Sequence, residues 1–301
     1  YTQCRACGYT LRCRRCDITL TYHHDGMFFL CHYCGYKSKL FHDCPKCQGS
    51  RFVRYGIGTK GVAQKVRALF PGTGVIRWDR DSSSSAKRRE EVLQDFREGR
   101  SQILIGTQMI AKGHHLPKVT FVGVILADVG LELPDFRANE RTFQMLYQVF
   151  GRAGRGVEKG RAVVQTFQPG HYAIKAAAAQ DYQLFLKTEL DYRRRHGHPP
   201  FTRLIRILRT ELDDCDCRRK VASLVDLLKS QKEAWGMSSV DVLGPTPAFP
   251  AFLRGRYRWQ VILRGSDPRS LLDTVEINQL HGTGSITQGG WTVEVDPVMV
   301  N

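Results

Sequence analysis

The chain has 301 residues, enough for two or three domains of ordinary size. With 42% apolar residues, 25% charged residues and a mean hydropathy of −0.33, it is neither a disordered chain nor one with a membrane-spanning run of about 18 apolar residues. Lys and Arg outnumber Asp and Glu by 45 to 29, and this charge of +16 favours a polyanionic partner, nucleic acid above all.

The positive charge is concentrated in the first 200 residues. Basic and acidic side chains number 9 and 3 in residues 1–54, 23 and 14 in residues 55–200, and 13 and 12 in residues 201–301. We expect these three segments to be separate domains. Because the sequence starts with Tyr1 and shows no secretory signal, we also expect a mature piece or fragment from a reducing compartment.

Eight of the ten cysteines lie in the first 47 residues, as four C-x-x-C pairs. The pairs are Cys4/Cys7, Cys13/Cys16, Cys31/Cys34 and Cys44/Cys47. This spacing puts two thiolates at two corners of a tetrahedron, as zinc requires. Disulfides would need an oxidising compartment, and one iron–sulfur cluster would leave four thiols idle, so the pattern favours two four-thiolate zinc sites.

The four pairs can combine in three ways, and the spacers of 5, 14 and 9 residues between them favour one. Fourteen residues suit the hairpin of a zinc ribbon, whereas five are short for it. We therefore expect a nested arrangement of two sites. The inner zinc would bind Cys13, Cys16, Cys31 and Cys34, and the outer zinc Cys4, Cys7, Cys44 and Cys47.

Residues 55–200 alternate between helical and extended patterns. Apolar spacing predicts helices over 61–72, 87–100 and 141–150, and strands over 75–79, 101–105, 119–126 and 162–167. Such alternation with short connections is typical of a parallel sheet with flanking helices, in which function lies at the carboxyl ends of the strands. The segment 105–115 and Asp128 follow two of the predicted strands.

A third cluster follows the helix predicted over 141–150. It reads Gln-x-x-Gly-Arg-x-Gly-Arg and spans Gln148, Arg152 and Arg155. Two guanidinium groups three residues apart share one face of a helical turn, and arginine suits a developing phosphoryl charge. The alternative is the basic end of a surface helix.

Residues 201–301 predict a small α+β domain, with strands over 203–209, 258–263 and 291–295 around a helix over 218–232. Arg256 and Arg258 belong to a basic aromatic cluster that would stack on bases or bind an acidic partner; the alternative is a strand edge with Trp259 turned inward. Cys215 and Cys217 lack the spacing of a metal knuckle, and we expect no site there.

Two long motifs, GTQMIAKGHHLPKVTFVGVILAD and PDFRANERTFQMLYQVFGRAGR, follow the four cysteine pairs in the sequence. They resemble the fifth and sixth helicase motifs of the PriA family of superfamily 2 replication-restart DNA helicases, and the cysteine pairs are similar to the cysteine-rich insert of that family. QTFQPGHYAI, HPPF, VLGPTPAF, GRYRWQ and VEVDPV agree with its later regions. The resemblance covers essentially the whole chain.

This resemblance implies the fold class: α/β, a RecA-like helicase lobe 2 with a parallel sheet and flanking helices, a two-zinc cysteine-rich module and a small α+β C-terminal domain. It implies that Arg152 and Arg155 reach the γ-phosphate of ATP with help from Gln148. It places Gly106, Thr107, Gln108 and Lys112 near the cleft and the DNA backbone. We assign Gly113, Asp128, Arg256 and Arg258 to nucleotide or DNA binding as well.

The resemblance also implies a function: the C-terminal portion of an ATP-dependent 3′ to 5′ helicase that binds forked and single-stranded DNA and restarts stalled replication by primosome assembly. Its protein partners would be single-strand-binding protein and primosome proteins, and it would not bind a membrane. It would be a monomer in the bacterial cytoplasm, at the nucleoid. No Walker A or B motif occurs in the sequence, so we expect the ATP and Mg²⁺ cradle on another lobe and no hydrolysis by this chain alone.

Two alternatives stay open at this point. One is a non-catalytic zinc-containing DNA-binding scaffold for replisome loading, and the other is an RNA helicase with a zinc domain. His115 stands where the family pattern has Asp, and Phe150 where it has Ala. We expect these departures to alter coupling or lobe packing without removing an arginine.

Overall fold

The computed structural model of the chain describes residues 2–7, 9–14, 19–23, 28–31, 34–39, 44–49, 52–54, 59–78, 86–107, 116, 118–151, 160–275 and 290–298. The chain divides into two compact units. Unit 1 contains Tyr1–Arg54, Gly130–Asn139 and Leu186–Asn301, and unit 2 contains Tyr55–Val129 and Glu140–Phe185. The three-domain division at residues 54 and 200 stays a prediction.

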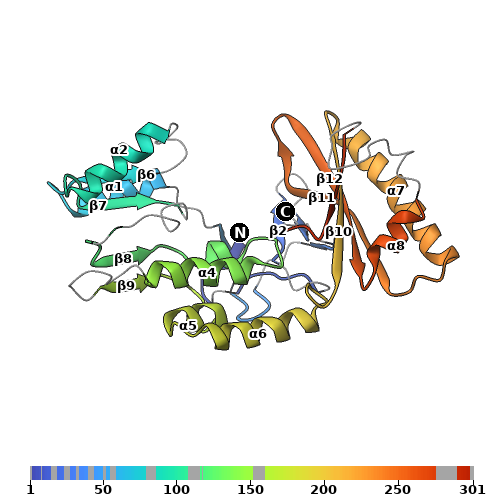
Figure 1. Cartoon of the computed structure of the whole chain (residues 1–301), viewed down its shortest axis with the longest axis horizontal. Coiled ribbons are helices and arrows are strands. Elements are labelled where there is room, and N and C mark those ends of the chain that lie inside the picture. The colour runs from blue at the N-terminus through green and yellow to red at the C-terminus, as the bar shows by residue number, and fades with distance from the viewer. Residues whose placement is uncertain are drawn as a thin grey trace. The chain divides into compact units, whose positions relative to one another are not determined.

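Unit 2 is built from short parallel strands and helices. Its elements are α1 (Thr59–Leu69), β6 (Val75–Trp78), α2 (Ala86–Arg97), β7 (Ile103–Gly106), β8 (Phe121–Val124), β9 (Arg161–Val164) and α5 (Tyr172–Ala178). β6 pairs with β7 and β8 with β9, both in parallel, and α1 and α2 lie beside the first pair (Figure 1). The predicted α/β class with a parallel arrangement is confirmed.

Two clusters hold unit 2 together. Trp78 at the end of β6 packs against Val92 and Leu93 of α2. The rings of Phe143 and Phe185 stack with centroids 3.9 Å apart and an interplanar angle of 3°. Phe143 lies in α4 (Ala138–Phe150), and Phe185 in α6 (Tyr182–Arg195).

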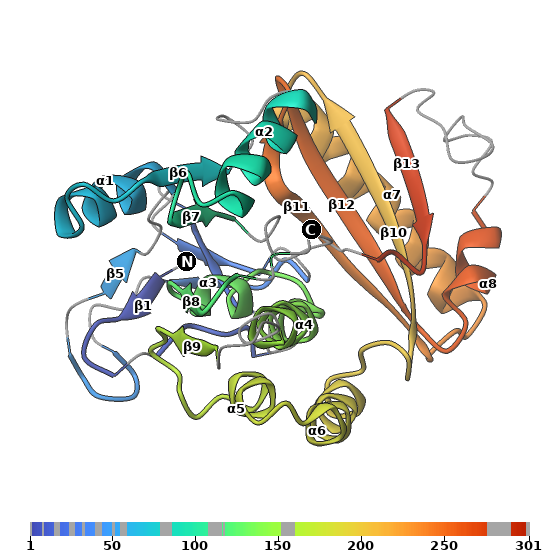
Figure 2. The same cartoon turned by 60° about the vertical axis from the view of Figure 1, so that its left-hand side comes forward.

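The C-terminal part of unit 1 is a four-stranded antiparallel sheet in the order β11-β12-β10-β13. The strands are β10 (Arg203–Glu211), β11 (Val240–Leu253), β12 (Arg256–Gly265) and β13 (Trp291–Val295). Helices α7 (Asp214–Ala234) and α8 (Pro268–Asp273) lie along the sheet (Figures 1 and 2). Alternate strand residues such as Ile205, Ile207, Val261 and Leu263 join Val221 and Leu228 of α7 in one buried core. The α+β character predicted for this region is confirmed.

The cysteine-rich part of unit 1 has short antiparallel strands. β1 (Thr2–Cys4) pairs with β5 (Phe52–Arg54), while β2 (Thr21–His23), β3 (Phe28–Leu30) and β4 (Lys37–Lys39) form a three-stranded sheet. Leu11 and Phe29 of this module are buried in one cluster with Phe136, Leu204 and Ile262. The module therefore shares a hydrophobic core with the C-terminal sheet.

The sequence patterns did not predict every element. Helices α5 and α6 and the 14-residue strand β11 were not predicted. β11 contains Pro245, Pro247 and Pro250, which cannot donate to a ladder, and its pairing with β12 shifts register around them. Among the described residues, every helix is too short or too polar to cross a membrane.

Candidate functional site

The first two and last two cysteines of the module meet at one point. The sulfur atoms of Cys4, Cys7, Cys44 and Cys47 all lie within 4.8 Å of one another. Cys4 Sγ is 3.6 Å from Cys47 Sγ, and Cys7 Sγ is 3.6 Å from Cys44 Sγ. The pairing of β1 with β5 brings these distant pairs together, because it places Cys4 opposite Phe52.

A second group joins the middle pairs. Cys13, Cys31 and Cys34 are buried with their sulfur atoms within 4.8 Å of one another, and Cys13 Sγ lies 3.5 Å from Cys34 Sγ. Cys16, the fourth cysteine expected here, lies outside the described residues. The structure thus brings the pairs together in two groups, one from the ends of the module and one from its middle.

The geometry of both groups fits zinc. Zinc–sulfur bonds of about 2.3 Å make a tetrahedron with sulfur atoms roughly 3.8 Å apart, close to the 3.5 and 3.6 Å seen here. Disulfide sulfurs would be about 2.05 Å apart. Cys217 and the exposed Cys215 lie outside both of these groups.

In two of the four knuckles the residue after the second cysteine is described and has left-handed backbone. Gly35 follows Cys34 with φ of 76°, and Gln48 follows Cys47 with φ of 57°. The N–H of Gly35 donates to the Cys31 carbonyl over 2.8 Å, and that of Gln48 to the Cys44 carbonyl, also over 2.8 Å. These bonds close the two turns and hold each pair of sulfur atoms on the same side.

The electrostatics of the outer group favour a bound cation. Desolvation opposes ionisation of Cys4, but N–H donors from Cys7 and Ala6 lower its pKa to about 7. Desolvation and the neighbouring thiols raise the pKa of Cys7 to about 12. One thiolate forms readily while further negative charge is resisted, so four thiolates need a dication among them.

A buried carboxylate holds the inner knuckle from both sides. Glu132 is 4% exposed and accepts a hydrogen bond of 2.9 Å from the Thr10 hydroxyl and a second bond from the Thr19 hydroxyl. Thr10 and Thr19 flank the Cys13–Cys16 turn, and Arg12 forms a β-bridge with Thr19. Glu132 therefore connects the two chain segments on either side of the Cys13–Cys16 turn.

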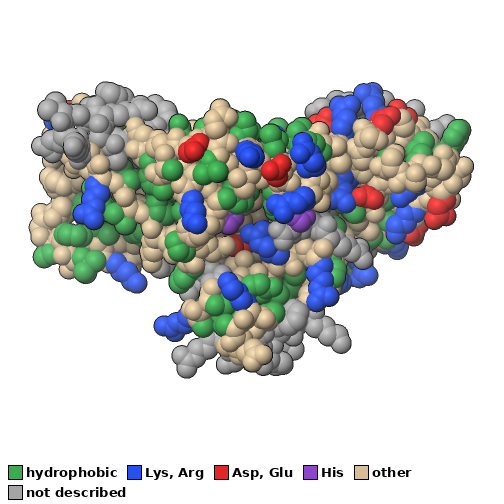
Figure 3. Space-filling view, turned by 90° about the horizontal axis from the view of Figure 1, so that it is seen from below, with side chains coloured by type: hydrophobic (Ala, Val, Ile, Leu, Met, Phe, Trp, Pro, Cys, Tyr) green, Lys and Arg blue, Asp and Glu red, His purple; other side chains and the backbone are tan. Residues whose placement is uncertain are grey.

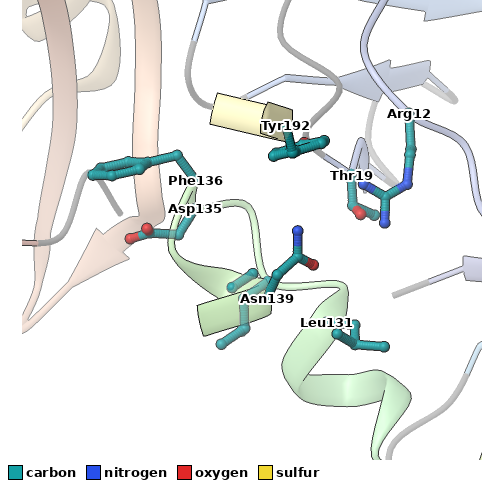
Figure 4. A pocket seen from close by; sticks show the side chains of 9 residues that line it. Arg12, Thr19, Leu131, Asp135, Phe136, Asn139 and Tyr192 are labelled. Carbon is teal, nitrogen blue, oxygen red and sulfur yellow. The ribbon is translucent and has the colours of Figure 1, made fainter. Parts of the chain in front are cut away.

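The same region encloses a small polar cavity. Arg12, Thr19, Asn139 and Tyr192 surround it, with Asp135 and Phe136 at one side (Figure 4). Its volume of about 10 Å³ suits one water molecule at most. The cavity is accordingly part of the packing around the knuckle and not a nucleotide pocket.

The sheet anchors the inner knuckle from the other direction. Thr246 on β11 is fully buried and donates its hydroxyl hydrogen bond to the Cys31 carbonyl over 3.3 Å. A Cβ added to Gly35 would meet the Pro245 carbonyl oxygen at 3.3 Å. These contacts explain why a ribbon near the start of the chain depends on a strand more than 200 residues later.

The predicted nucleotide and DNA residues of unit 2 are only partly described. Gln108, Lys112, Gly113, Arg152 and Arg155 lie outside the described residues, as does His115. Gly106 ends β7 and Thr107 is exposed beside it. Gln148 is exposed near the C-terminal end of α4, and Phe150 is half-buried there.

Asp128 lies just after β8, and its side chain is held by hydrogen bonds inside unit 2. It is fully buried and accepts hydrogen bonds from the Thr166 hydroxyl over 3.1 Å and from the Phe167 N–H over 3.2 Å. These contacts tie the segment after β8 to the segment after β9. Nucleotide or DNA contact by Asp128 stays a prediction.

Arg256 and Arg258 lie on β12 near the turn that joins it to β11. Arg256 is exposed, whereas Arg258 is half-buried and donates to the Pro250 carbonyl over 3.0 Å. Desolvation lowers the pKa of Arg258. Trp259 packs against the α7 core and its indole N–H donates to Asp214 over 2.8 Å, so its ring is turned inward.

Basic side chains are spread widely over the surface. Figure 3 shows Lys and Arg side chains singly and in small groups among apolar and uncharged ones. The excess charge in the sequence thus corresponds, on this face, to a distributed positive field and not to one compact patch.

Sequence reasoning missed Glu132, Thr246 and the buried pair Arg193 and Glu189. Arg193 Nε donates to Glu189 Oε1 over 2.7 Å, its guanidinium lies 5.4 Å from the Phe136 ring centroid, and the pair is almost entirely buried. A Glu–x–x–x–Arg spacing on a helix is the one local signal that would have drawn attention to it. The partners of Glu132 and Thr246 carry no such signal.

Three protein families match successive parts of the chain. Residues 13–39 match the PriA DNA helicase Cys-rich region (CRR) domain, residues 73–157 the helicase conserved C-terminal domain, and residues 194–298 the primosomal protein N C-terminal domain. The first of these ranges contains the four cysteines assigned to the inner zinc.

Whole-chain comparison finds curated proteins named replication restart protein PriA. The chain is 38% identical to that of Bacillus subtilis over 88% of its length, 36% to that of Haemophilus influenzae over 98%, and 40% to that of Treponema pallidum over 87%. It spans only 32%, 40% and 39% of those relatives. Because its cysteine-rich module, helicase lobe and C-terminal domain all match, the chain belongs to the PriA family of replication restart proteins.

Proposed function

We propose that this chain is the C-terminal part of an ATP-dependent DNA helicase that moves 3′ to 5′, binds forked and single-stranded DNA, and restarts stalled replication by primosome assembly. The observation that carries the proposal is the combination, in one order, of a helicase C-terminal lobe with the Cys-rich region of PriA. A general RNA helicase would share the lobe but not this insert.

In this proposal the chain supplies part of the nucleotide site. Arg152 and Arg155 stabilise charge on the transferred γ-phosphoryl group, which an arginine finger does by roughly 10³ to 10⁵ in rate. Gln148, exposed near the C-terminal end of α4, helps to hold the phosphate. ATP and Mg²⁺ are bound mainly by the other lobe, so the chain alone does not hydrolyse ATP.

The zinc ions have a structural role in the proposal. The inner ion binds Cys13, Cys16, Cys31 and Cys34, and the outer ion binds Cys4, Cys7, Cys44 and Cys47. The sulfur distances of 3.5 and 3.6 Å support this assignment. The two ions order a module that has only short strands and a small core of its own.

DNA contacts come from both units. Gly106, Thr107, Gln108, Lys112 and Gly113 contact the phosphate backbone, and Arg256 and Arg258 add contacts from the C-terminal domain. Single-strand-binding protein and primosome proteins are the protein partners, and the protein works as a monomer in the bacterial cytoplasm at the nucleoid. The net charge of +16 supports binding to a polyanion.

The proposal is tested by ATP hydrolysis of the full-length protein that contains this chain, with saturating forked DNA. Arg155→Ala is expected to lower the DNA-stimulated rate at least about a hundredfold, or roughly 2.7 kcal/mol of transition-state stabilisation. If the unaltered protein never hydrolyses ATP, the motor function is wrong and a DNA-binding scaffold takes its place. Equal rates in both proteins would remove only the role given to Arg155.

A further inference from the structure

The turn between β11 and β12 is a two-residue hairpin turn. Leu253 and Arg256 are the last paired residues, so only Arg254 and Gly255 form the turn. Both have left-handed backbone, with φ of 53° and 77°. Two successive residues of this kind make a type I′ turn, which matches the twist of the strands and fixes the tip rigidly.

Two aromatic rings are exposed beside this turn. Phe252 on β11 is paired directly with Tyr257 on β12, so both side chains stand on the same face of the hairpin. Their centroids lie 4.9 Å apart and the rings are inclined at 56°, so neither ring covers the other face to face. Phe252 is 54% exposed and Tyr257 36% exposed, so both rings present apolar surface to a ligand.

The charge at the tip is positive. Arg254 and Arg256 are exposed, and within the described ranges no carboxylate lies within ion-pair distance of either. Glu211, which is paired in register with Tyr257, has its charge balanced by Arg209 and Lys220. Lys220 also pairs with Asp216 over 2.7 Å. The two tip arginines are therefore available to an anionic ligand.

We infer that the β11–β12 tip, defined here as Phe252, Arg254, Arg256 and Tyr257, is a stacking platform for unpaired bases of single-stranded DNA. The rings accept base faces, and the arginines bind the neighbouring phosphates. Paired bases in a duplex hide their faces in the stack, so the tip selects single strands. This inference rests on the proposed binding of single-stranded DNA and adds the residues that contact the bases.

Single-stranded DNA fits the tip better than an acidic peptide does. Carboxylates would use Arg254 and Arg256 but gain nothing from two exposed ring faces. A stacked base gains from both, because base–aromatic stacking is independent of sequence and the rigid turn reduces the ordering cost on binding. Trp235, at the end of α7, provides a contrast. It is 67% exposed, but its indole N–H donates to Gln231, and among the described side chains no second ring pairs with it.

The experiment measures equilibrium binding of the full-length protein to fluorescent oligonucleotides. The double variant Phe252→Ser with Tyr257→Ser should bind single-stranded DNA at least roughly tenfold more weakly, while Phe252→Tyr with Tyr257→Phe should bind like the unaltered protein. Trp235→Ser is the matched control, since it removes a more exposed ring, and should leave affinity unchanged. Circular dichroism and thermal unfolding verify that each variant is folded.

A second arm identifies stacking itself. Replacing consecutive nucleotides by abasic sites should weaken binding of the unaltered protein but have little further effect on the double serine variant. Arg256→Gln should reduce the salt dependence of binding by about one phosphate contact. The platform is wrong if the double serine variant binds single strands as tightly as the unaltered protein. It is also wrong if abasic sites weaken binding of the variant as much as they weaken binding of the unaltered protein. Preferential binding of an acidic peptide by the intact tip would overturn it too.

The outcome is separable from the proposed function as a whole. DNA-stimulated ATP hydrolysis at saturating forked DNA reports on the motor, whereas the platform is measured as affinity without ATP. Normal hydrolysis with unchanged single-strand affinity in the double serine variant would reject the platform alone. No hydrolysis in the unaltered protein, with the tenfold loss of affinity still seen, would reject the motor and leave the platform.

Discussion

The hydroxyl of Thr10 donates a hydrogen bond of 2.9 Å to Glu132, a residue 122 positions further along the chain. Both side chains are buried, and Thr19 donates to the other oxygen of the same carboxylate. A buried carboxylate is stable only when its oxygens are hydrogen-bonded, so the two threonines and Glu132 depend on one another. This relationship links the inner zinc knuckle to the segment that precedes α4.

Removing this carboxylate should destabilise unit 1. In Glu132→Ala the two threonine hydroxyls stay buried without their acceptor, and each such group costs about 1–3 kcal/mol. We expect the free energy of unfolding to fall by about 2 kcal/mol or more, and zinc release to a chelator to become faster. Denaturant unfolding and a colorimetric zinc assay measure the two effects. Glu233→Ala, at an exposed position of α7, is the control, and a similar small loss in both variants would contradict the prediction.

The two metal sites should lose their ions separately. Cys44→Ser removes a ligand of the outer group only, so the protein should retain the inner zinc and bind about one ion in place of two. Cys34→Ser should do the reverse. Cys215→Ser is the control, because that thiol is exposed and belongs to neither group. Metal analysis by mass spectrometry counts the ions, and loss of both from either single variant would mean that the nested assignment is wrong.

Two ion pairs on α6 offer a matched comparison. Glu189 and Arg193 are almost fully buried, whereas Asp191 and Arg194, with side chains 55% and 66% exposed, form a looser pair of 3.6 Å. Glu189→Ala leaves a buried guanidinium without its carboxylate and should cost about 3–5 kcal/mol of folding free energy. Asp191→Ala should cost less than about 1 kcal/mol. Equal losses would show that burial does not set the strength of these pairs.

Cys217 should resist alkylation in the folded protein. Burial raises the pKa of its thiol to about 11, and the thiol hydrogen bond to the Arg209 carbonyl keeps it in the neutral form. Because the folded pKa lies above the unfolded value of about 8.5, this stabilisation is complete below pH 8.5 and is lost as the pH rises through 11. Iodoacetamide at pH 8 should label Cys215 quickly and Cys217 only after unfolding, as peptide mass spectrometry would show. Equal labelling rates in the native protein would contradict this.

Local patterns predicted the features that neighbouring residues determine. Apolar spacing predicted a helix over 87–100, and Val92 and Leu93 of the observed helix α2 are buried against Trp78. The cysteine spacers similarly predicted which pairs would meet, because the length of a loop limits where its ends can go.

Features that depend on residues far apart in the chain could not be predicted from local sequence patterns. Nothing near Glu132 indicates that it faces Thr10, and nothing near Thr246 indicates that it binds the Cys31 carbonyl. β11 was missed because its three prolines argue against a strand, although partial pairing with β12 tolerates them. Asp128 has the sequence position of a site residue, yet its carboxylate is used in packing.

The shared core of Leu11, Phe29, Leu204 and Ile262 also bears on how the protein is made. Ribosomes add about 5–20 residues per second, so the cysteine-rich module leaves the ribosome roughly 10 to 40 seconds before β12 does. During that interval its apolar side has no sheet to cover it. Early capture of zinc by the knuckles would order the nascent module while it waits, and zinc supply during translation then becomes a determinant of how much protein reaches the folded state.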